Sequence, residues 1–115
     1  MELTVDLTFL NEISDGDQEF ITDVLQTFLI EMPKDMSQLR EAIKTENIKD
    51  IGKVAHKTKS TLQTLGLHEL KEMAYTIERS AKATPPPPAQ ELGAHAYTFA
   101  DYIDKACIKV RTLLD

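Results

Sequence analysis

Residues 92–113 read LGAHAYTFADYIDKACIKVRTL, and this stretch decides the fold class. Its apolar residues recur at alternating intervals of four and three, the spacing of one buried face of an α-helix. A helix with one apolar face needs neighbours that cover it, so the stretch predicts the last helix of a helical bundle. The residues of that face are Leu92, Ala96, Phe99, Ile103, Ala106, Val110 and Leu113.

The rest of the chain also shows helical spacing, with no strand-like alternation. Asp17 and Asn47 are predicted N-caps, Pro33 is predicted to open a helix of its own, and Gly66 is predicted to end or bend a helix. The four prolines that follow Thr84 predict an extended connector. The helices expected before this connector cover residues 6–13, 18–31, 33–43, 48–65 and 67–82, with approximate ends.

These elements predict an all-α fold, an antiparallel up-and-down four-helix bundle with a short N-terminal helical extension. The length of 115 residues and the hydrophobic content of 42% suit one compact core, so residues 1–115 are expected to form a single domain.

Composition excludes several classes of partner. The net charge of −6 disfavours binding to nucleic acid. No apolar run approaches the roughly 20 residues that cross a bilayer, and no secretory signal precedes the first helix, so no membrane association is expected. The single cysteine, Cys107, cannot form an internal disulfide, which favours a reducing, cytoplasmic location.

The helix expected to begin at Ile48 carries a polar stripe with His56 at its centre. At about 100° per residue, the apolar residues of this helix fall on the side opposite His56. Gly52 and Ser60, one turn before and after, are small and are expected to leave the imidazole open to solvent. The residues within about 60° of His56 are Lys49, Gly52, Lys53, Lys59, Ser60 and Gln63.

An open histidine beside a cation can accept a phosphoryl group. Neutral imidazole is a nucleophile at cytosolic pH. A phosphoryl group brings up to about two negative charges, and Lys59, three residues after His56, can form a charge-assisted hydrogen bond with it. Phosphoryl transfer depends mainly on positioning and charge stabilisation, which these residues would supply.

The stretch from Ala55 to Leu70 resembles the signature of histidine-containing phosphotransfer (HPt) domains, which runs roughly A-H-x-L-K-G-S followed by a spaced glycine and leucine. The similarity extends over about residues 5–113. Ser60 occupies the position where the family usually has glycine, and this difference is expected to affect the rate of phosphoryl transfer. Thr58 occupies a position where Leu or Ile is usual, and this difference is expected to affect stability.

The resemblance implies a role for several side chains. His56 would be the phosphoacceptor, Lys59 would stabilise the phosphoryl group, and Ser60, Gln63 and Glu78 would lie near the site. We further expect a docking surface around His56 for the partner, formed by Gly52, Lys53 and Lys57 and widened by Phe9 and Ile13.

The resemblance also implies the partners. They would be response-regulator receiver domains, with a hybrid sensor histidine kinase as a further candidate. The domain would take the phosphoryl group from one receiver aspartate and pass it to another, without ATP-dependent kinase activity of its own. It would act as a monomer without a cofactor, because the magnesium ion would be held by the receiver.

Two alternatives remain open at this point. The sequence around His56 also resembles the histidine box of the dimerisation and phosphoacceptor domain of sensor histidine kinases, although Thr61 replaces the usual proline. A helical adaptor could also use the same face without phosphorylation. A metal site from His56, His68 and His95 is disfavoured, because no pair has the spacing of three or four that places two ligands on one helix face.

Overall fold

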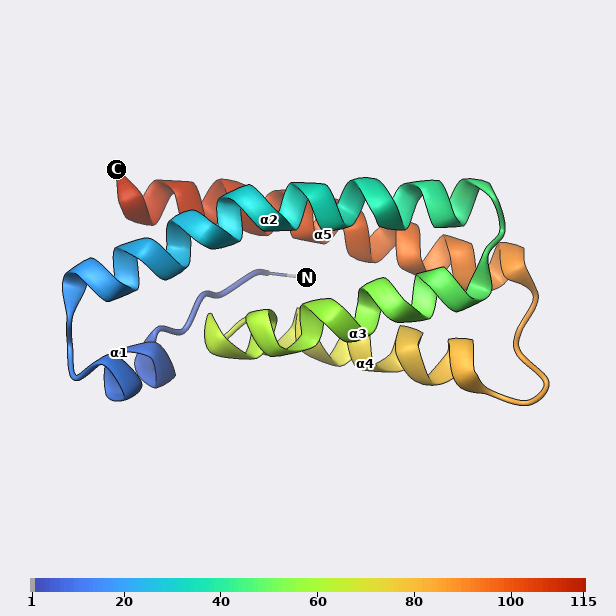
Figure 1. The fold of residues 1–115 in the computed structure, drawn as a ribbon, viewed down its shortest axis with the longest axis horizontal. Helices are drawn as coiled ribbons and strands as arrows, with labels where there is room; N and C mark the ends of the chain where they lie inside the picture. The colour runs from blue at the N-terminus through green and yellow to red at the C-terminus, as the bar shows by residue number, and fades with distance from the viewer. Residues whose placement is uncertain (1) are drawn as a thin grey trace.

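The computed structural model describes residues 2–115, which form five α-helices and no strand. Figure 1 shows α2 and α5 lying side by side, with α3 and α4 paired beneath them and the short α1 at one end. The predicted four-helix bundle with an N-terminal helical extension is therefore confirmed. The helices are α1 (Thr8–Ser14), α2 (Gln18–Lys44), α3 (Ile48–Thr64), α4 (His68–Lys82) and α5 (Ala89–Leu114).

The helix ends follow the predicted capping residues. The Asp17 side chain accepts hydrogen bonds from the backbone N–H groups of Glu19 and Phe20, and the Asn47 side chain accepts one from Asp50. Each satisfies a donor that the first turn of a helix leaves unpaired. Gly66 has a φ of 66°, a left-handed conformation that ends α3 rather than bending it.

The prediction that Pro33 opens a separate helix was wrong, because α2 runs through it without interruption. Pro33 is exposed, whereas Phe28, Met32 and Met36 of the same helix are buried. Burial of this apolar face offsets the roughly 3 kcal/mol that proline costs inside a helix. The early part of α2 is inclined to the rest in Figure 1, as expected near a proline.

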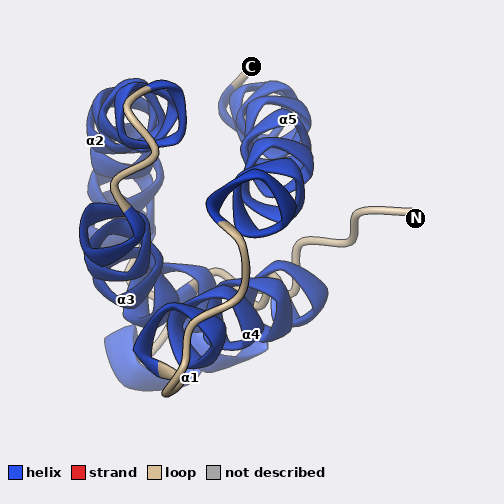
Figure 2. Ribbon diagram, turned by 90° about the vertical axis from the view of Figure 1, so that its right-hand side faces the viewer, coloured by secondary structure: helices blue, strands red, loops and turns tan. Residues whose placement is uncertain are grey.

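The core lies along the axis of the bundle, and the apolar face predicted for the last helix supplies much of it. Six of its seven residues are buried, from Leu92 to Val110, but Leu113 is half exposed because it lies at the end of α5. Residues 83–88 form the extended connector predicted from the prolines, which crosses from α4 to α5 in Figure 2. Among the described residues, no helix is long and apolar enough to cross a membrane.

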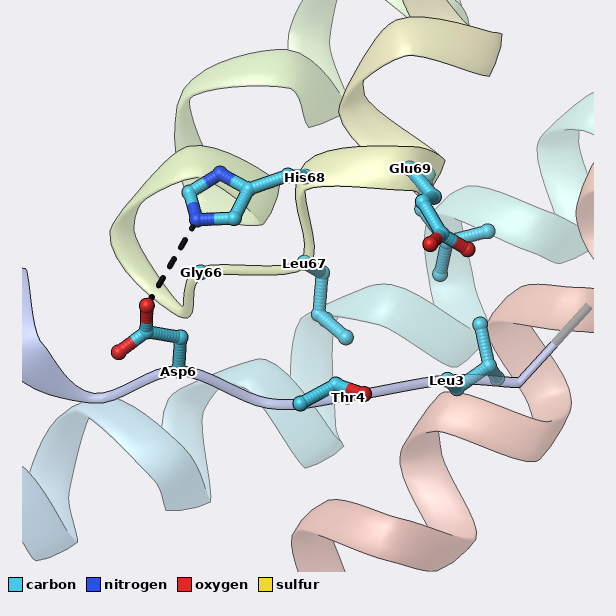
Figure 3. Close-up of a pocket in the computed structure, with 8 residues that line it drawn as sticks. Leu3, Thr4, Asp6, Gly66, Leu67, His68 and Glu69 are labelled. Carbon is cyan, nitrogen blue, oxygen red and sulfur yellow. Dashed lines mark ion pairs between the residues drawn. The ribbon is translucent and has the colours of Figure 1, made fainter.

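The N-terminal segment before α1 is extended and packs against the turn between α3 and α4, so the helix predicted from Asp6 begins at Thr8 instead. The Asp6 backbone N–H donates to the Leu65 carbonyl at 3.2 Å. Leu3 is buried, and its carbonyl accepts a hydrogen bond from Lys109 of α5. Figure 3 shows this segment running beneath the turn at Gly66. We call residues 3–6 the N-terminal strap.

Candidate functional site

His56 lies on α3 with 66% of its side chain exposed. The buried face of α3 includes Ile51, Val54, Ala55, Thr58 and Leu62, which places His56 on the opposite, solvent side of the helix. The imidazole is therefore accessible to another molecule, in the position that the helical spacing predicted.

The imidazole is held by a buried carboxylate from the neighbouring helix. Glu78 of α4 is 4% exposed, and its Oε2 atom contacts Nδ1 of His56. The two residues are 22 positions apart in sequence and meet because α3 and α4 are antiparallel neighbours. Glu78 was expected near the imidazole from the family resemblance, and the structure places it there.

Two lysines complete the environment of Glu78. Lys59 Nζ lies 2.5 Å from Oε1, and Lys82 Nζ lies 3.1 Å from Oε2. The hydrogen bond from Lys59, followed by those from Lys82 and His56, outweighs the effect of burial and lowers the pKa of Glu78 to about 2. Glu78 is therefore ionised at neutral pH.

An ionised carboxylate fixes the tautomer of the ring. A carboxylate can only accept hydrogen bonds, so Nδ1 of His56 must carry the proton in their contact. In the neutral imidazole the lone pair then resides on Nε2. In this tautomer, Nε2 is the ring nitrogen that can act as a nucleophile.

Lys57 points to a different helix from the other site lysines. Its Nζ lies 2.8 Å from Oδ1 of Asp35, a buried residue of α2, and this pairing raises the pKa of Lys57. The side chain remains 59% exposed. Lys57 therefore borders the α2 side of the site, whereas Lys53 is exposed on the α4 side.

The imidazole is open to solvent as expected, but Gly52 itself does not face open space. Gly52 is buried, and a Cβ atom at this position would lie 2.7 Å from the Cβ of Ala81 on α4. The residue allows α3 and α4 to approach closely, so its side chain position is not available to a docking partner. Only its backbone borders a hollow next to His56, whose lining is Ile48, Lys49, Gly52, Lys53, His56, Ala81 and Lys82.

The other expected residues are distributed along two helices. Ser60 and Gln63 are exposed on α3, further along the polar stripe. Phe9 and Ile13 are 45% and 56% exposed on α1, which packs against α2. They are exposed apolar residues of α1, which lies at one end of the bundle, and the structure shows no contact between them and His56.

Two residues near the site were not predicted. Lys82 contacts Glu78 from one turn further along α4, and the interval of four between them is a pattern that could have indicated it. Lys59 and Arg79 each lie over the Tyr75 ring, 5.3 Å from its centroid. No sequence pattern relates Tyr75 to Lys59, because they come from different helices.

The remaining histidines lie apart from this site. His68 begins α4 and lies 3.9 Å from Asp6 of the strap, and His95 is exposed on α5. Within residues 2–115, no group of three or more histidine, cysteine or acidic side chains is arranged to hold a metal ion.

Comparison with known proteins gives two matches. The sequence model of the Hpt domain family matches residues 23–112. The fold is similar to the crystal structure of the HPT domain from the Hpt sensor hybrid histidine kinase of Shewanella, with a TM-score of 0.81 and 14% sequence identity over 96% of this chain and 92% of that chain. At this identity the structural likeness shows the fold alone. No curated protein matches the chain.

Proposed function

Because the chain belongs to the Hpt domain family, whose members carry out histidine phosphotransfer in phosphorelays, we propose that His56 is the residue that accepts the phosphoryl group. It would receive the group from the aspartate of one receiver domain and pass it to the aspartate of another. The observation that carries this proposal is the contact between Glu78 and Nδ1 of His56, which leaves Nε2 free on an exposed ring.

The transfer step follows from this contact. The lone pair of Nε2 forms the N–P bond while the P–O bond of the aspartyl phosphate breaks, and the departing oxygen keeps that electron pair as a carboxylate. The proton stays on Nδ1, so the phosphorylated ring carries a positive charge. Glu78 lies against this ring, and its negative charge stabilises the cation as it forms.

The positive charge of Lys59 supports the same step. Its Nζ contacts Glu78, and the residue lies one helical turn after His56, so in this proposal its positive charge attracts a phosphoryl group on the ring. Ser60 and Gln63 border the phosphoryl group in this proposal. Ser60 is exposed and leaves its hydroxyl available as a donor.

The receiver would dock over His56, between the exposed Lys53 on one side and Lys57 on the other, with Phe9 and Ile13 extending the contact. We propose that the magnesium ion belongs to the receiver and that this chain needs no cofactor. One chain supplies all four bundle helices, which supports a monomer and disfavours the two-helix hairpin of a histidine kinase dimer. The lone cysteine supports a cytoplasmic location.

The experiment is phosphoryl transfer from a phosphorylated receiver domain. The wild-type chain and a His95→Gln variant are expected to become labelled, because His95 is exposed on a different helix. The His56→Gln variant is expected to remain unlabelled. Labelling of His56→Gln, or no labelling of the wild type by any receiver that labels a known Hpt domain, would refute the proposal.

A further inference from the structure

The two lysines that contact Glu78 differ in their freedom to move. Lys59 is 26% exposed, its Nζ lies 2.5 Å from Oε1, and it also lies over the Tyr75 ring. It is thus held by an ionic contact and by a cation–π contact. Lys82 is 70% exposed, and its one ionic contact within residues 2–115 is the 3.1 Å contact with Oε2. Lys82 is therefore the cation that can leave the carboxylate at lower cost.

The position of Lys82 relates it directly to the reacting ring. Its partner Oε2 is the same oxygen that contacts Nδ1 of His56. Lys82 and His56 also line the same hollow between α3 and α4. A lysine side chain has four flexible carbons, so Nζ can move within this hollow without movement of the helix.

We infer that Lys82 is the cation that contacts the phosphoryl group once it is on His56, while Lys59 stays with Glu78 as a positioning residue. This inference rests on the proposed function and assigns separate roles to the two lysines of the site. Lys82 would exchange its contact with Oε2 for a contact with a phosphoryl oxygen.

The charges of the site favour this exchange. Before transfer, the single negative charge of Glu78 faces two ammonium groups and the imidazole ring. After transfer, the ring is positive and contacts Oε2, so this oxygen keeps a positive partner when Lys82 departs. The phosphoryl group brings about two negative charges, which attract the released ammonium group. The carboxylate therefore remains compensated throughout.

The consequence is a longer lifetime of the phosphorylated state. Hydrolysis of an N–P bond proceeds through a loose transition state in which electrons move from the phosphoryl oxygens towards phosphorus. An ammonium group that binds those oxygens opposes this movement. An exposed ionic contact of this kind corresponds to about a threefold to fivefold change in rate.

The test measures the half-life of phosphohistidine in the full chain after labelling with phosphoramidate, a small donor that requires no docking surface. Lys82→Gln is expected to shorten the half-life about threefold to fivefold, and Lys82→Arg is expected to restore it. Lys44→Gln, an exposed lysine at the end of α2, is the matched control and is expected to behave as the wild type. Increasing salt is expected to shorten the wild-type half-life but not that of Lys82→Gln.

Two results would overturn this inference. One is a half-life of Lys82→Gln equal to that of Lys44→Gln, and the other is an equal response of both variants to salt. A failure of the proposed function is recognised separately, because no receiver domain would then label the wild type at His56, whether or not phosphoramidate does. Circular dichroism of each variant checks that the fold is retained.

Discussion

At the level of single residues, Glu78 organises the site. It is buried, it accepts contacts from His56, Lys59 and Lys82, and it comes from a helix other than that of His56. A buried carboxylate is stable only when it is paired in this way. The same contacts that stabilise its charge also fix the proton on Nδ1, so structural and chemical roles coincide in one side chain.

This arrangement predicts a dependence of stability on pH. The pKa of Glu78 is lowered from 4.5 to about 2. The contribution of this carboxylate to the free energy of unfolding is therefore complete above about pH 4.5 and is lost as the pH falls towards 2. We expect Glu78→Gln to have a lower free energy of unfolding than the wild type at neutral pH, by on the order of 3 kcal/mol. The difference should shrink on acidification.

Urea denaturation followed by circular dichroism, repeated between about pH 7 and pH 2.5, measures this difference. The wild type and Glu78→Gln share all other carboxyl groups. The difference between their free energies of unfolding therefore excludes the titration of those groups. A difference that stays constant across this range would contradict the role of Glu78 as a charged, paired residue.

The sequence predicted only part of this residue-level arrangement. The solvent side of α3 followed from helical spacing, which is a local property, and His56 and Lys59 lie where that spacing puts them. Glu78 was expected only from the family resemblance, because nothing in the spacing relates it to a residue 22 positions earlier. Tyr75 was missed for the same reason, whereas Lys82 follows Glu78 by four residues and could have been found once Glu78 was placed in the site.

At the level of helices, the close approach of α3 and α4 brings Glu78 to His56. Gly52 makes this approach possible, since a Cβ atom there would collide with Ala81. From the sequence we expected open space at Gly52, because this glycine lies on the polar side of its helix. The pattern does not distinguish a glycine that faces solvent from one that faces a neighbouring helix. Only the packing angle of α4 decides between the two.

Two glycine variants test this packing. Gly52→Ala is expected to lower the free energy of unfolding by about 1 kcal/mol, because overpacking outweighs the gain in helix propensity. Gly93→Ala is the matched control, since its Cβ would lie 3.3 Å from a side-chain methyl group of Ile43, which can move. Gly93→Ala should be the more stable variant in urea denaturation.

The opposite order of stability for the two variants would show that Gly52 does not set the distance between α3 and α4. The glycine pair is informative because both residues are buried in helices, and a general effect of alanine in a helix applies equally to each.

Helix α2 shows a second limit of the sequence pattern. Proline usually marks a helix boundary, and this rule predicted a break at Pro33. The buried series Phe28, Met32, Met36 and Leu39 continues across the proline at helical spacing. This periodicity was the better indicator, because the burial of one continuous face outweighs a single unfavourable residue.

At the level of the whole molecule, the N-terminal strap joins elements that are distant in sequence. Leu3 inserts near the turn between α3 and α4 and contacts Lys109 of α5, while Asp6 pairs with the backbone of that turn. The sequence analysis did not identify this extended segment, in which Leu3 is buried and Val5 and Leu7 are partly buried. The segment is short, and the burial of its side chains depends on contacts that only the assembled bundle provides.

The strap predicts an effect on global stability that is separate from chemistry. Leu3→Ala is expected to lower the free energy of unfolding by about 2 kcal/mol, the lower end of the range for buried leucines, because the segment lies near the edge of the bundle. Thr4→Ala, an exposed neighbour, is the control and should be near neutral. Labelling of His56 by a receiver should be unchanged in both variants at low temperature.

Thermal unfolding of the two variants provides the measurement. Equal melting temperatures for Leu3→Ala and Thr4→Ala would mean that the strap contributes nothing to the fold. A loss of labelling in a folded Leu3→Ala protein would mean that the strap and the site are coupled.

We propose that the assembled bundle presents Nε2 of His56 as the nucleophile while Glu78 holds the proton on Nδ1. The most direct measurement is nuclear magnetic resonance of the phosphorylated chain with nitrogen-15 in its histidines, which identifies the nitrogen that is coupled to phosphorus. We predict phosphorus on Nε2 of His56 and hydrogen on Nδ1. Phosphorus on Nδ1, or on any residue other than His56, would contradict the account.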